Sequence, residues 1–495
     1  MKSEFFFFLE KNRHGRAFFI IFMSVLTVWP TVATTQEARY FIANQHKVDI
    51  SSFDRKLNKM IDEVGVPGIS VAIISNNKVV YSNGYGYKQA STKDKVNSET
   101  IFEACSVSKT YLAFVALKLV DEGKLDLDKP MYQYMEYKPL AHDPRYKLIT
   151  PRMALCHTTG IENWIWDNNP DTLELLYNPS ERYSYSGEGY QYLALVIQSI
   201  LHKPYEQYIR EMILAPLNLK RTFTFYSKDG SFPVNYAIGH SVLKKEVPKW
   251  KNFEPLPAAG VNVSAYDYAE FLISVFDKHN LSSMQRKNIL SPYVLLDKQS
   301  PDIYRGTAFE VLYEPKDTII SHSGNNMGFK AFVAYSVVSR SGFVLFANGD
   351  LGVQMANYIC NLSVGLDIAP FFRTDIIPQY SSPAFSLLKI YREKNSDSMF
   401  AEIERRQNVD KHLAHTLNGL SELLYTVDKV VAKKLLDNNI SQHPNDPEAY
   451  YLLGETYMGQ KQYQSAYQYF VKSKEMGFNI IDCDEYIRKC RTIMK

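Results

Sequence analysis

Apolar residues in the first 360 positions fall into strand-like runs near both ends and helix-like runs between them. Ile69 to Ser75 is largely apolar, Asn76-Asn77 suits a tight turn, and Lys78 to Tyr87 runs back, which predicts a β-hairpin. Strand patterns return in Gly328 to Val338 and Gly342 to Ala347. We therefore expect one sheet built from both ends of this region.

The segment between these strands is expected to be mainly helical. Thr110 to Glu122 is apolar around nearly its whole circumference and stops at Gly123, which predicts a buried helix with a glycine cap. Further helical patterns cover Tyr190 to Leu201, Tyr205 to Ile213 and Tyr266 to Phe276. The predicted fold class is α+β, with an all-helical insertion in the sheet.

The last quarter of the chain has a different pattern. Residues 366–384 contain Pro370, Pro378 and Pro383 and are predicted to be a linker. Residues 385–495 are helical throughout and show a 34-residue period typical of tetratricopeptide repeats, carried by Tyr450, Leu453, Gly454, Tyr457, Ala466, Phe470 and Ser473. One period earlier, Ala432, Leu436 and Pro444 fit, whereas Gly419 and Leu420 fit poorly, and a weaker unit is expected between Phe385 and Gln407. An isolated amphipathic helix pair can mimic one repeat, so this alternative stays open.

Composition narrows the class of protein. The chain has 495 residues and a formal net charge of +3, which gives no electrostatic footprint for nucleic acid. Five cysteines are too few, and odd in number, for a disulfide framework. These numbers indicate an ordinary globular protein of several domains.

The amino terminus carries a localisation signal. Basic residues from Lys11 to Arg16 precede an apolar run from Ala17 to Trp29, and small residues follow up to Ala33, which predicts a signal peptide over residues 1–33. The 13-residue apolar run is shorter than the roughly 20 residues that cross a bilayer. The extra run Phe5 to Phe8 favours an alternative, an uncleaved segment that keeps the exported protein at the membrane.

The first chemical motif is Ser106-Val107-Ser108-Lys109, which matches S-x-x-K. The same spacing at Ser75/Lys78, Ser241/Lys244 and Ser386/Lys389 shows that the match alone is weak. Ser106, however, stands at the start of the predicted buried helix, where a spacing of three residues places Ser106 and Lys109 on one face. A serine hydroxyl needs a neighbouring base to become nucleophilic, and a lysine of lowered pKa can serve.

Two further motifs follow in the order of a known family. They are Tyr185-Ser186-Gly187, just before a helix, and His322-Ser323-Gly324, near the late strands. With them, the chain resembles the serine β-lactamase and penicillin-binding family, in its class C and D-Ala-D-Ala carboxypeptidase branch. The similarity covers about residues 50 to 360 and includes Val66-Pro67-Gly68, Glu122-Gly123-Lys124-Leu125, His157-Thr158-Thr159-Gly160 and Ala347-Asn348-Gly349. It implies a transpeptidase-like antiparallel sheet in a hydrolase domain over residues 46–365.

The resemblance also implies a role for each motif. Ser106 would be the acylated nucleophile, Lys109 would share in activating it, and Tyr185 would relay protons. His322, Ser323 and Gly324 would line the site and contact the substrate. The backbone N–H groups of Ser106 and Asn325 would form the oxyanion hole.

Two departures from the family pattern affect the expected substrate. The second motif usually ends in an asparagine whose amide binds the substrate, and Gly187 cannot supply it. The third motif begins with His322 rather than the lysine of class C β-lactamases, as in carboxypeptidase and esterase relatives. Both departures argue against an efficient β-lactamase. We expect His157 to serve in packing, away from the acylation chemistry.

Other catalytic classes lack their motifs. The sequence has no G-x-S-x-G elbow, no H-E-x-x-H run and no glycine-rich phosphate loop, so no metal and no cofactor is implied. We therefore predict an exported serine hydrolase acting through an acyl-enzyme on a peptide, ester or β-lactam carbonyl. The alternative is a non-catalytic protein whose degenerate site holds a ligand while the repeats bind a peptide or protein partner.

Overall fold

The computed structural model describes residues 39–165, 172–226, 232–248, 254–296, 300–373, 376, 378–407, 412–478 and 480–494. The predicted signal peptide, residues 1–33, lies outside these ranges. Within them, no helix combines the length and apolar character needed to cross a membrane. Residues 39–495 group into a single compact unit.

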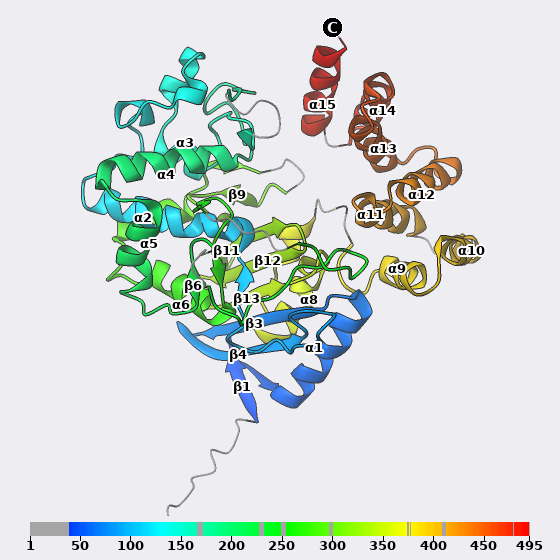
Figure 1. The fold of residues 1–495 in the computed structure, drawn as a ribbon, viewed down its shortest axis with the longest axis horizontal. Helices are drawn as coiled ribbons and strands as arrows, with labels where there is room; N and C mark the ends of the chain where they lie inside the picture. Colours follow the sequence, from blue (N-terminus) through cyan, green and yellow to red (C-terminus); the bar gives the residue numbers. More distant parts are fainter. Residues whose placement is uncertain are drawn as a thin grey trace, which may run out of the picture. The chain divides into compact units, whose positions relative to one another are not determined.

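An antiparallel sheet of eight strands forms the centre of the fold (Figure 1), in the order β4-β3-β13-β12-β11-β10-β9-β8. The strands are β3 (Gly68–Ser75), β4 (Lys78–Gly86), β8 (Val294–Leu295), β9 (Ile303–Arg305), β10 (Glu310–Glu314), β11 (Asp317–Asn326), β12 (Phe329–Ser336) and β13 (Ser341–Ala347). The early hairpin joins the late strands where Val71 of β3 pairs with Leu345 of β13. The prediction of one sheet made from both ends of the region is therefore confirmed.

The hairpin turn follows from its two asparagines. Asn76 and Asn77 have φ angles of 50° and 58°, so both are left-handed. A two-residue turn of this kind matches the twist of the flanking strands, and asparagine tolerates the conformation better than most residues.

Helices cover both faces of the sheet, and each face has its own core. One core contains α2, α4 and α6, and the other contains α1 and α8, which lie on the opposite side of the sheet in Figure 1. The helices of this region are α1 (Ile50–Val64), α2 (Lys109–Asp121), α3 (Pro151–Leu155), α4 (Gly187–Leu201), α5 (Tyr205–Ile209), α6 (Ala265–Val275), α7 (Ser283–Leu290) and α8 (Ala356–Ser363). The expected insertion between the early and late strands is mainly helical, but it is not all-helical, because it also contains a small sheet of three short strands.

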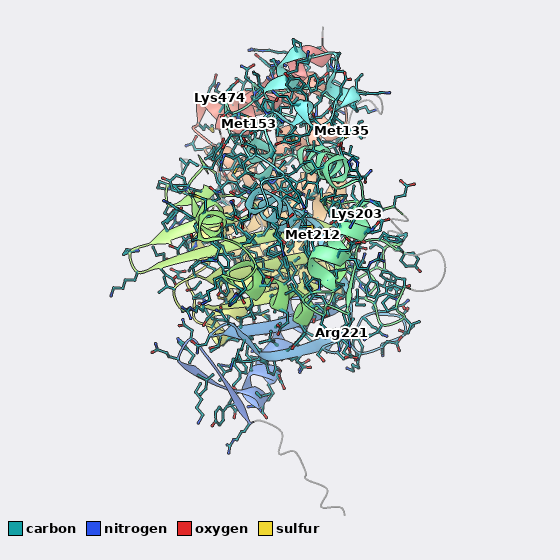
Figure 2. All side chains as sticks on the ribbon, turned by 90° about the vertical axis from the view of Figure 1, so that its left-hand side faces the viewer. Met135, Met153, Lys203, Met212, Arg221 and Lys474 are labelled. Atoms are coloured by element: carbon teal, nitrogen blue, oxygen red, sulfur yellow. The ribbon has the colours of Figure 1, made fainter. Side chains whose placement is uncertain are left out.

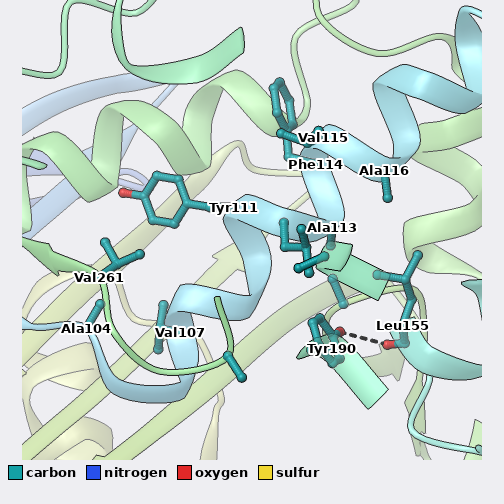
Figure 3. Packing of buried hydrophobic residues seen from close by; sticks show 14 of the residues in the cluster. Ala104, Val107, Tyr111, Ala113, Phe114, Val115, Ala116, Leu155, Tyr190 and Val261 are labelled. Carbon is teal, nitrogen blue, oxygen red and sulfur yellow. Dashed lines mark hydrogen bonds between the residues drawn. The ribbon is translucent and has the colours of Figure 1, made fainter. Parts of the chain in front are cut away.

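Helix α2 runs through the first core (Figure 3). Tyr111 stacks on Phe271 of α6 with ring centroids 4.1 Å apart, and Tyr190 of α4 donates a hydrogen bond to the Leu155 carbonyl over 3.0 Å. Fully burying each large apolar side chain contributes about 1.5–3 kcal/mol. The helix that carries the S-x-x-K lysine is thus held rigidly from all sides.

Two small sheets complete the first part of the chain. One pairs β1 (Tyr40–Ala43) with β2 (His46–Asp49), and the other has the order β5 (Phe102–Glu103), β7 (Asn262–Val263), β6 (Thr222–Phe223). Arg221, labelled in Figure 2, forms ion pairs with Glu99 and with Asp267 in the first turn of α6. These contacts fasten the second small sheet to the helical region.

The carboxy-terminal part is all-helical, as predicted. Its helices are α9 (Pro383–Glu393), α10 (Ser396–Arg406), α11 (Leu413–Tyr425), α12 (Lys429–Gln442), α13 (Pro447–Gly459), α14 (Tyr463–Glu475) and α15 (Ile480–Ile493). In the pair α13–α14, a Cβ at Gly454 would lie 2.6 Å from the Phe470 ring. This explains why a small residue faces a large one at these two repeat positions. Assignment of the array to the tetratricopeptide family stays a prediction.

The carboxy-terminal helices contact the sheet-containing part of the chain at both ends of the array. Arg392 of α9 donates hydrogen bonds to the carbonyls of Val64 and Val242 over 2.9 and 2.8 Å. At the far end, the Tyr177 hydroxyl donates to Glu485 of α15 over 2.8 Å. The core that contains α1 and α8 also includes buried residues of α9, α11 and α12. The domain limits at 46–365, 366–384 and 385–495 therefore stay a prediction.

Candidate active site

Ser106 lies in a tight turn, Cys105–Ser108, that leads directly into α2. Cys105 has φ = 52°, a left-handed conformation that is rare for a non-glycine residue and common at functional sites. The Ser108 hydroxyl donates to the Cys105 carbonyl over 2.6 Å and accepts from the Val261 N–H over 3.1 Å, which fixes the turn. Ser106 is partly exposed, although its neighbours on both sides are buried. The fold thus presents this serine to the solvent.

Lys109 is fully buried one turn beyond Ser106. Its Nζ lies 3.4 Å from Ser106 Oγ and donates to the Ala258 carbonyl over 2.8 Å. Burial lowers the pKa of Lys109 below its usual range, Arg305 lowers it further, and contact with Tyr185 opposes the shift. A neutral amine near a hydroxyl can accept its proton, so the geometry suits a base for Ser106.

Tyr185 completes a cluster of three predicted residues. The Lys109 Nζ lies 4.8 Å from the centroid of the Tyr185 ring. The structure therefore brings Ser106, Lys109 and Tyr185 together around one point.

His157 packs against the second motif, Tyr185-Ser186-Gly187. The prediction that it lies away from the acylation chemistry is therefore wrong. Its ring is stacked on Tyr185, its Nδ1 accepts the Ser186 N–H over 3.1 Å, and its carbonyl accepts the Ser184 N–H over 2.8 Å. Burial, followed by the charges of Arg305 and Lys109, lowers the pKa of His157 well below its usual range. His157 is a packing residue, as expected, but what it packs is the motif tyrosine.

Gly187 is covered by an aromatic ring. A Cβ at this position would lie 2.5 Å from Cη2 of Trp164, closer than real Cβ contacts. The centroid of the Trp164 ring also lies 5.8 Å from Lys109 Nζ. The glycine that departs from the family pattern is thus matched by a bulky side chain from another segment.

The third motif is part of β11 rather than the start of a strand near Gly328. The sequence pattern missed β11 because the polar run from Ser321 to Asn326 hides the strand alternation. Gly324 is required here, since a Cβ would lie 2.8 Å from the Ala104 carbonyl oxygen and from Cys105 Cβ. Strand β11 therefore packs directly on the turn that carries Ser106. This places the Asn325 backbone beside that turn, and the oxyanion hole of Ser106 and Asn325 stays a prediction.

His322 and Ser323 have different surroundings. His322 is buried next to Arg305, and burial followed by the charges of Arg305 and Lys109 lowers its pKa well below the usual range. Ser323 is exposed and lines a separate cavity of about 230 Å³ with Phe332 and Phe371. The structure therefore groups His322, but not the side chain of Ser323, with Ser106 and Lys109.

Arg305 is a residue of this site that the sequence reasoning missed. It is 1% exposed in β9, donates to the Ala308 carbonyl over 3.0 Å, and its Nη2 lies 3.4 Å from His322 Nε2. Burial opposes its charge, but Tyr190, Tyr183 and Glu310 raise its pKa above the usual range. In addition to the amine of Lys109, the site thus holds one buried group, the Arg305 guanidinium, that stays charged. No local motif marks Arg305, because pairing of β9 with β10 brings it there.

Comparison with known proteins identifies the class. The family model described as Beta-lactamase matches residues 53–358, more than half of the chain. The chain therefore belongs to the Beta-lactamase family. Solved structures that share its fold include a class C β-lactamase, a D-alanine carboxypeptidase and a hydrolase with promiscuous acyltransferase activity.

Individual relatives are distant. Protein flp of Staphylococcus aureus (strain MW2) is 27% identical over 315 residues, which cover 57% of this chain and 60% of that protein. The penicillin-binding protein homologue of Pyrococcus abyssi has a TM-score of 0.56 at 21% identity, covering 70% of this chain and 82% of that one. The D-alanine carboxypeptidase AmpC of Burkholderia cenocepacia has a TM-score of 0.53 at 20% identity, covering 63% and 98%. The chain thus matches only about 60% of the length of its first curated relatives.

Proposed function

We propose that this protein is an exported serine hydrolase that forms a covalent acyl-enzyme at Ser106. The observation that carries the proposal is the pair formed by the partly exposed Ser106 Oγ and the buried Lys109 Nζ, 3.4 Å apart. Export rests on the predicted signal peptide.

In the first half-reaction, Ser106 Oγ bonds to the substrate carbonyl carbon while Lys109 accepts the hydroxyl proton. The bond to the leaving group breaks, and the leaving group departs with a proton relayed through Tyr185. In the second half-reaction, a water oxygen bonds to the ester carbonyl carbon and gives up a proton to the same groups. The bond to Ser106 Oγ breaks, Oγ takes up that proton, and the acid is released. No redox change and no further reactant is needed.

The favoured substrates are esters and D-Ala-D-Ala-type peptides, and β-lactams come next. Burial keeps His322 neutral around pH 7, so the third motif lacks the positive charge of a lysine there, which favours neutral esters over both classes of substrate that carry a carboxylate, D-Ala-D-Ala peptides and β-lactams. Gly187 lacks the amide that would hold a penicillin-like side chain. The resemblance to a D-alanine carboxypeptidase and to a hydrolase with promiscuous acyltransferase activity supports this order.

Pre-steady-state hydrolysis of 4-nitrophenyl butyrate tests the proposal. With this activated ester we expect acylation to be faster than deacylation, so the acyl-enzyme should accumulate and give a burst of nitrophenol equal to the enzyme concentration, followed by slower turnover. Lys109→Met should remove the burst, because the hydroxyl loses its base. Turnover that continues in this variant at the wild-type rate would contradict the role of Lys109.

A second candidate function, binding of a peptide partner by the helical array, has one observation in its favour. Helices α11, α13 and α15 enclose a cavity of about 230 Å³, lined by Ser421, Glu422, Tyr425, Leu452, Glu455, Thr456, Met458 and Tyr486. This volume lies below the roughly 300–1,000 Å³ of drug-sized sites and suits one side chain. Its carboxylates and tyrosines favour a lysine.

Isothermal titration tests this second candidate. The acetylated tripeptide amide Ala-Lys-Ala should bind more tightly than the same peptide with norleucine, and Glu422→Gln should remove the difference. Equal binding of both peptides would contradict a cation-binding pocket.

A further inference from the structure

The amine of Lys109 binds a backbone carbonyl as well as contacting Ser106. Its Nζ donates to the Ala258 carbonyl over 2.8 Å, and the same Nζ lies 3.4 Å from Ser106 Oγ. A neutral amine has two N–H groups and one lone pair, so an N–H bonded to Ala258 restricts where the lone pair points. The position of the Ala258 carbonyl therefore affects how well Lys109 can accept the Ser106 proton.

Ala258 lies in a turn whose own hydrogen bonds leave its N–H unused. The N–H groups of Ala259 and Gly260 both donate to the Leu256 carbonyl, over 3.0 and 2.7 Å, and residue 257 is a proline without an N–H. Ala258 is 0% exposed. Since a buried N–H is costly without an acceptor, this one requires an acceptor from another part of the chain.

Gln191 supplies this acceptor from helix α4. Its Oε1 accepts the Ala258 N–H over 3.2 Å. Because an N–H can only donate, the atom of the side-chain amide that faces Ala258 must be the oxygen. Gln191 directly follows Tyr190, which is fully buried and donates to the Leu155 carbonyl. The glutamine thus extends to Ala258 from a part of the helix that is itself held in place.

We propose that Gln191 is a positioning residue for acylation, which holds the Ala258 carbonyl where it binds Lys109 Nζ. This inference rests on the proposed acyl-enzyme function. The contacts run from Gln191 through Ala258 and Lys109 to Ser106, so the glutamine acts on the nucleophile only through the lysine. Without the glutamine oxygen, the buried Ala258 N–H is left unpaired until the backbone shifts to another acceptor, and the carbonyl of the same residue shifts with it.

The rate constant of the nitrophenol burst with 4-nitrophenyl butyrate measures this effect. Gln191→Met keeps the length of the side chain but removes the acceptor, so we expect the burst rate constant at saturating ester to fall about 3- to 10-fold. The ester concentration that gives half the maximal rate should stay within about twofold, because the lost contact acts on the lysine and not on the ester. The matched control is Gln198→Met, which changes an exposed glutamine of the same helix and should keep the wild-type rate.

A double-variant cycle with Lys109→Met shows whether Gln191 acts through the lysine. The measured quantity is the slow labelling of Ser106 by a fluorescent phosphonate, followed over hours. No amine remains to be positioned in the Lys109→Met background, so adding Gln191→Met should change the labelling rate less than twofold. A purely structural role predicts the same loss in both backgrounds. If the labelling is too slow to measure, the split between burst rate and half-saturation decides alone.

A further variant replaces Gln191→Met if that protein does not fold. Gln191→Asn keeps a polar amide but withdraws its oxygen from Ala258 by one methylene group. It should show the same fall in burst rate constant and the same unchanged half-saturation. Melting followed by circular dichroism checks that each variant is folded.

The outcomes distinguish this inference from the function on which it rests. A wild-type protein with neither a nitrophenol burst nor a phosphonate label would overturn both. If the wild-type protein reacts but Gln191→Met acylates at the same rate, or loses the same factor in the Lys109→Met background, only the inference is overturned. A loss confined to the half-saturating ester concentration would also overturn it, because Gln191 would then bind the ester instead of positioning the base.

Discussion

The rings of His157 and Tyr185 are stacked, with centroids 4.2 Å apart and planes inclined by 26°. The two residues come from segments 28 positions apart in the sequence. His157 Nδ1 also accepts the Ser186 N–H, and its carbonyl accepts the Ser184 N–H. His157 therefore contacts the residues on both sides of Tyr185 in the chain. We therefore expect His157 to be a positioning residue, which acts through Tyr185 rather than on the substrate.

Separating the two contacts of His157 tests this role. His157→Phe keeps the stacked ring but leaves the Ser186 N–H without its acceptor, so we expect kcat for 4-nitrophenyl butyrate to fall about tenfold. His157→Gln retains an acceptor and should recover part of that loss. KM should change less than kcat in both. Equal kcat losses in the two variants would contradict a role for this hydrogen bond.

The charge of Arg305 should be visible in the titration of His322. Burial and the Arg305 charge both lower the pKa of this histidine. Arg305→Gln should therefore raise the His322 pKa relative to Arg305→Lys, which keeps a positive charge. NMR titration with isotope-labelled histidine measures the shift. The same His322 pKa in both variants would mean that burial alone accounts for it.

Gly324 is expected to be indispensable for acylation. Ala at this position would bring its Cβ to 2.8 Å from the Ala104 carbonyl, so β11 must move away from the Ser106 turn. A displacement of about 1 Å can cost about 100-fold in rate. The matched control is Gly189→Ala, whose Cβ would meet only ordinary contacts from 3.4 Å. Similar acylation rates in both variants would contradict the close packing.

Two buried histidines should make the fold sensitive to acid. The pKa values of His157 and His322 are well below 6.5 in the folded protein, so the unfolded chain binds more protons as the pH falls below about 6.5. Their contribution to stability is complete above about pH 6.5 and decreases below it, by up to about 1.4 kcal/mol per pH unit for each residue.

Urea unfolding at pH 7.5 and 5.5 measures this dependence. His157→Gln and His322→Gln should each lose less free energy of unfolding between the two pH values than the wild-type protein does. A variant whose loss matches the wild type would show that its histidine is protonated in the folded state as readily as in the unfolded chain.

The sequence predicted the parts of the fold with strong local patterns. The hairpin around Asn76-Asn77, the buried helix after Ser106 and the helical carboxy-terminal part all have such patterns. Strand β11 was missed because its motif residues interrupt the apolar alternation. The triad of Ser106, Lys109 and Tyr185 was found because its motifs are local. Arg305 and Trp164 were not, because only the pairing of strands and the packing on α4 bring them to the site.

The central claim is a covalent intermediate on Ser106, and peptide mapping by mass spectrometry after treatment with a fluorescent phosphonate tests it most directly. We expect one phosphonate per protein molecule, on the peptide that contains Ser106, and no adduct in Ser106→Ala. The matched control is Ser241→Ala, because Ser241 and Lys244 have the same S-x-x-K spacing and this variant should still be labelled. An adduct on another residue, or labelling that persists in Ser106→Ala, would contradict the account.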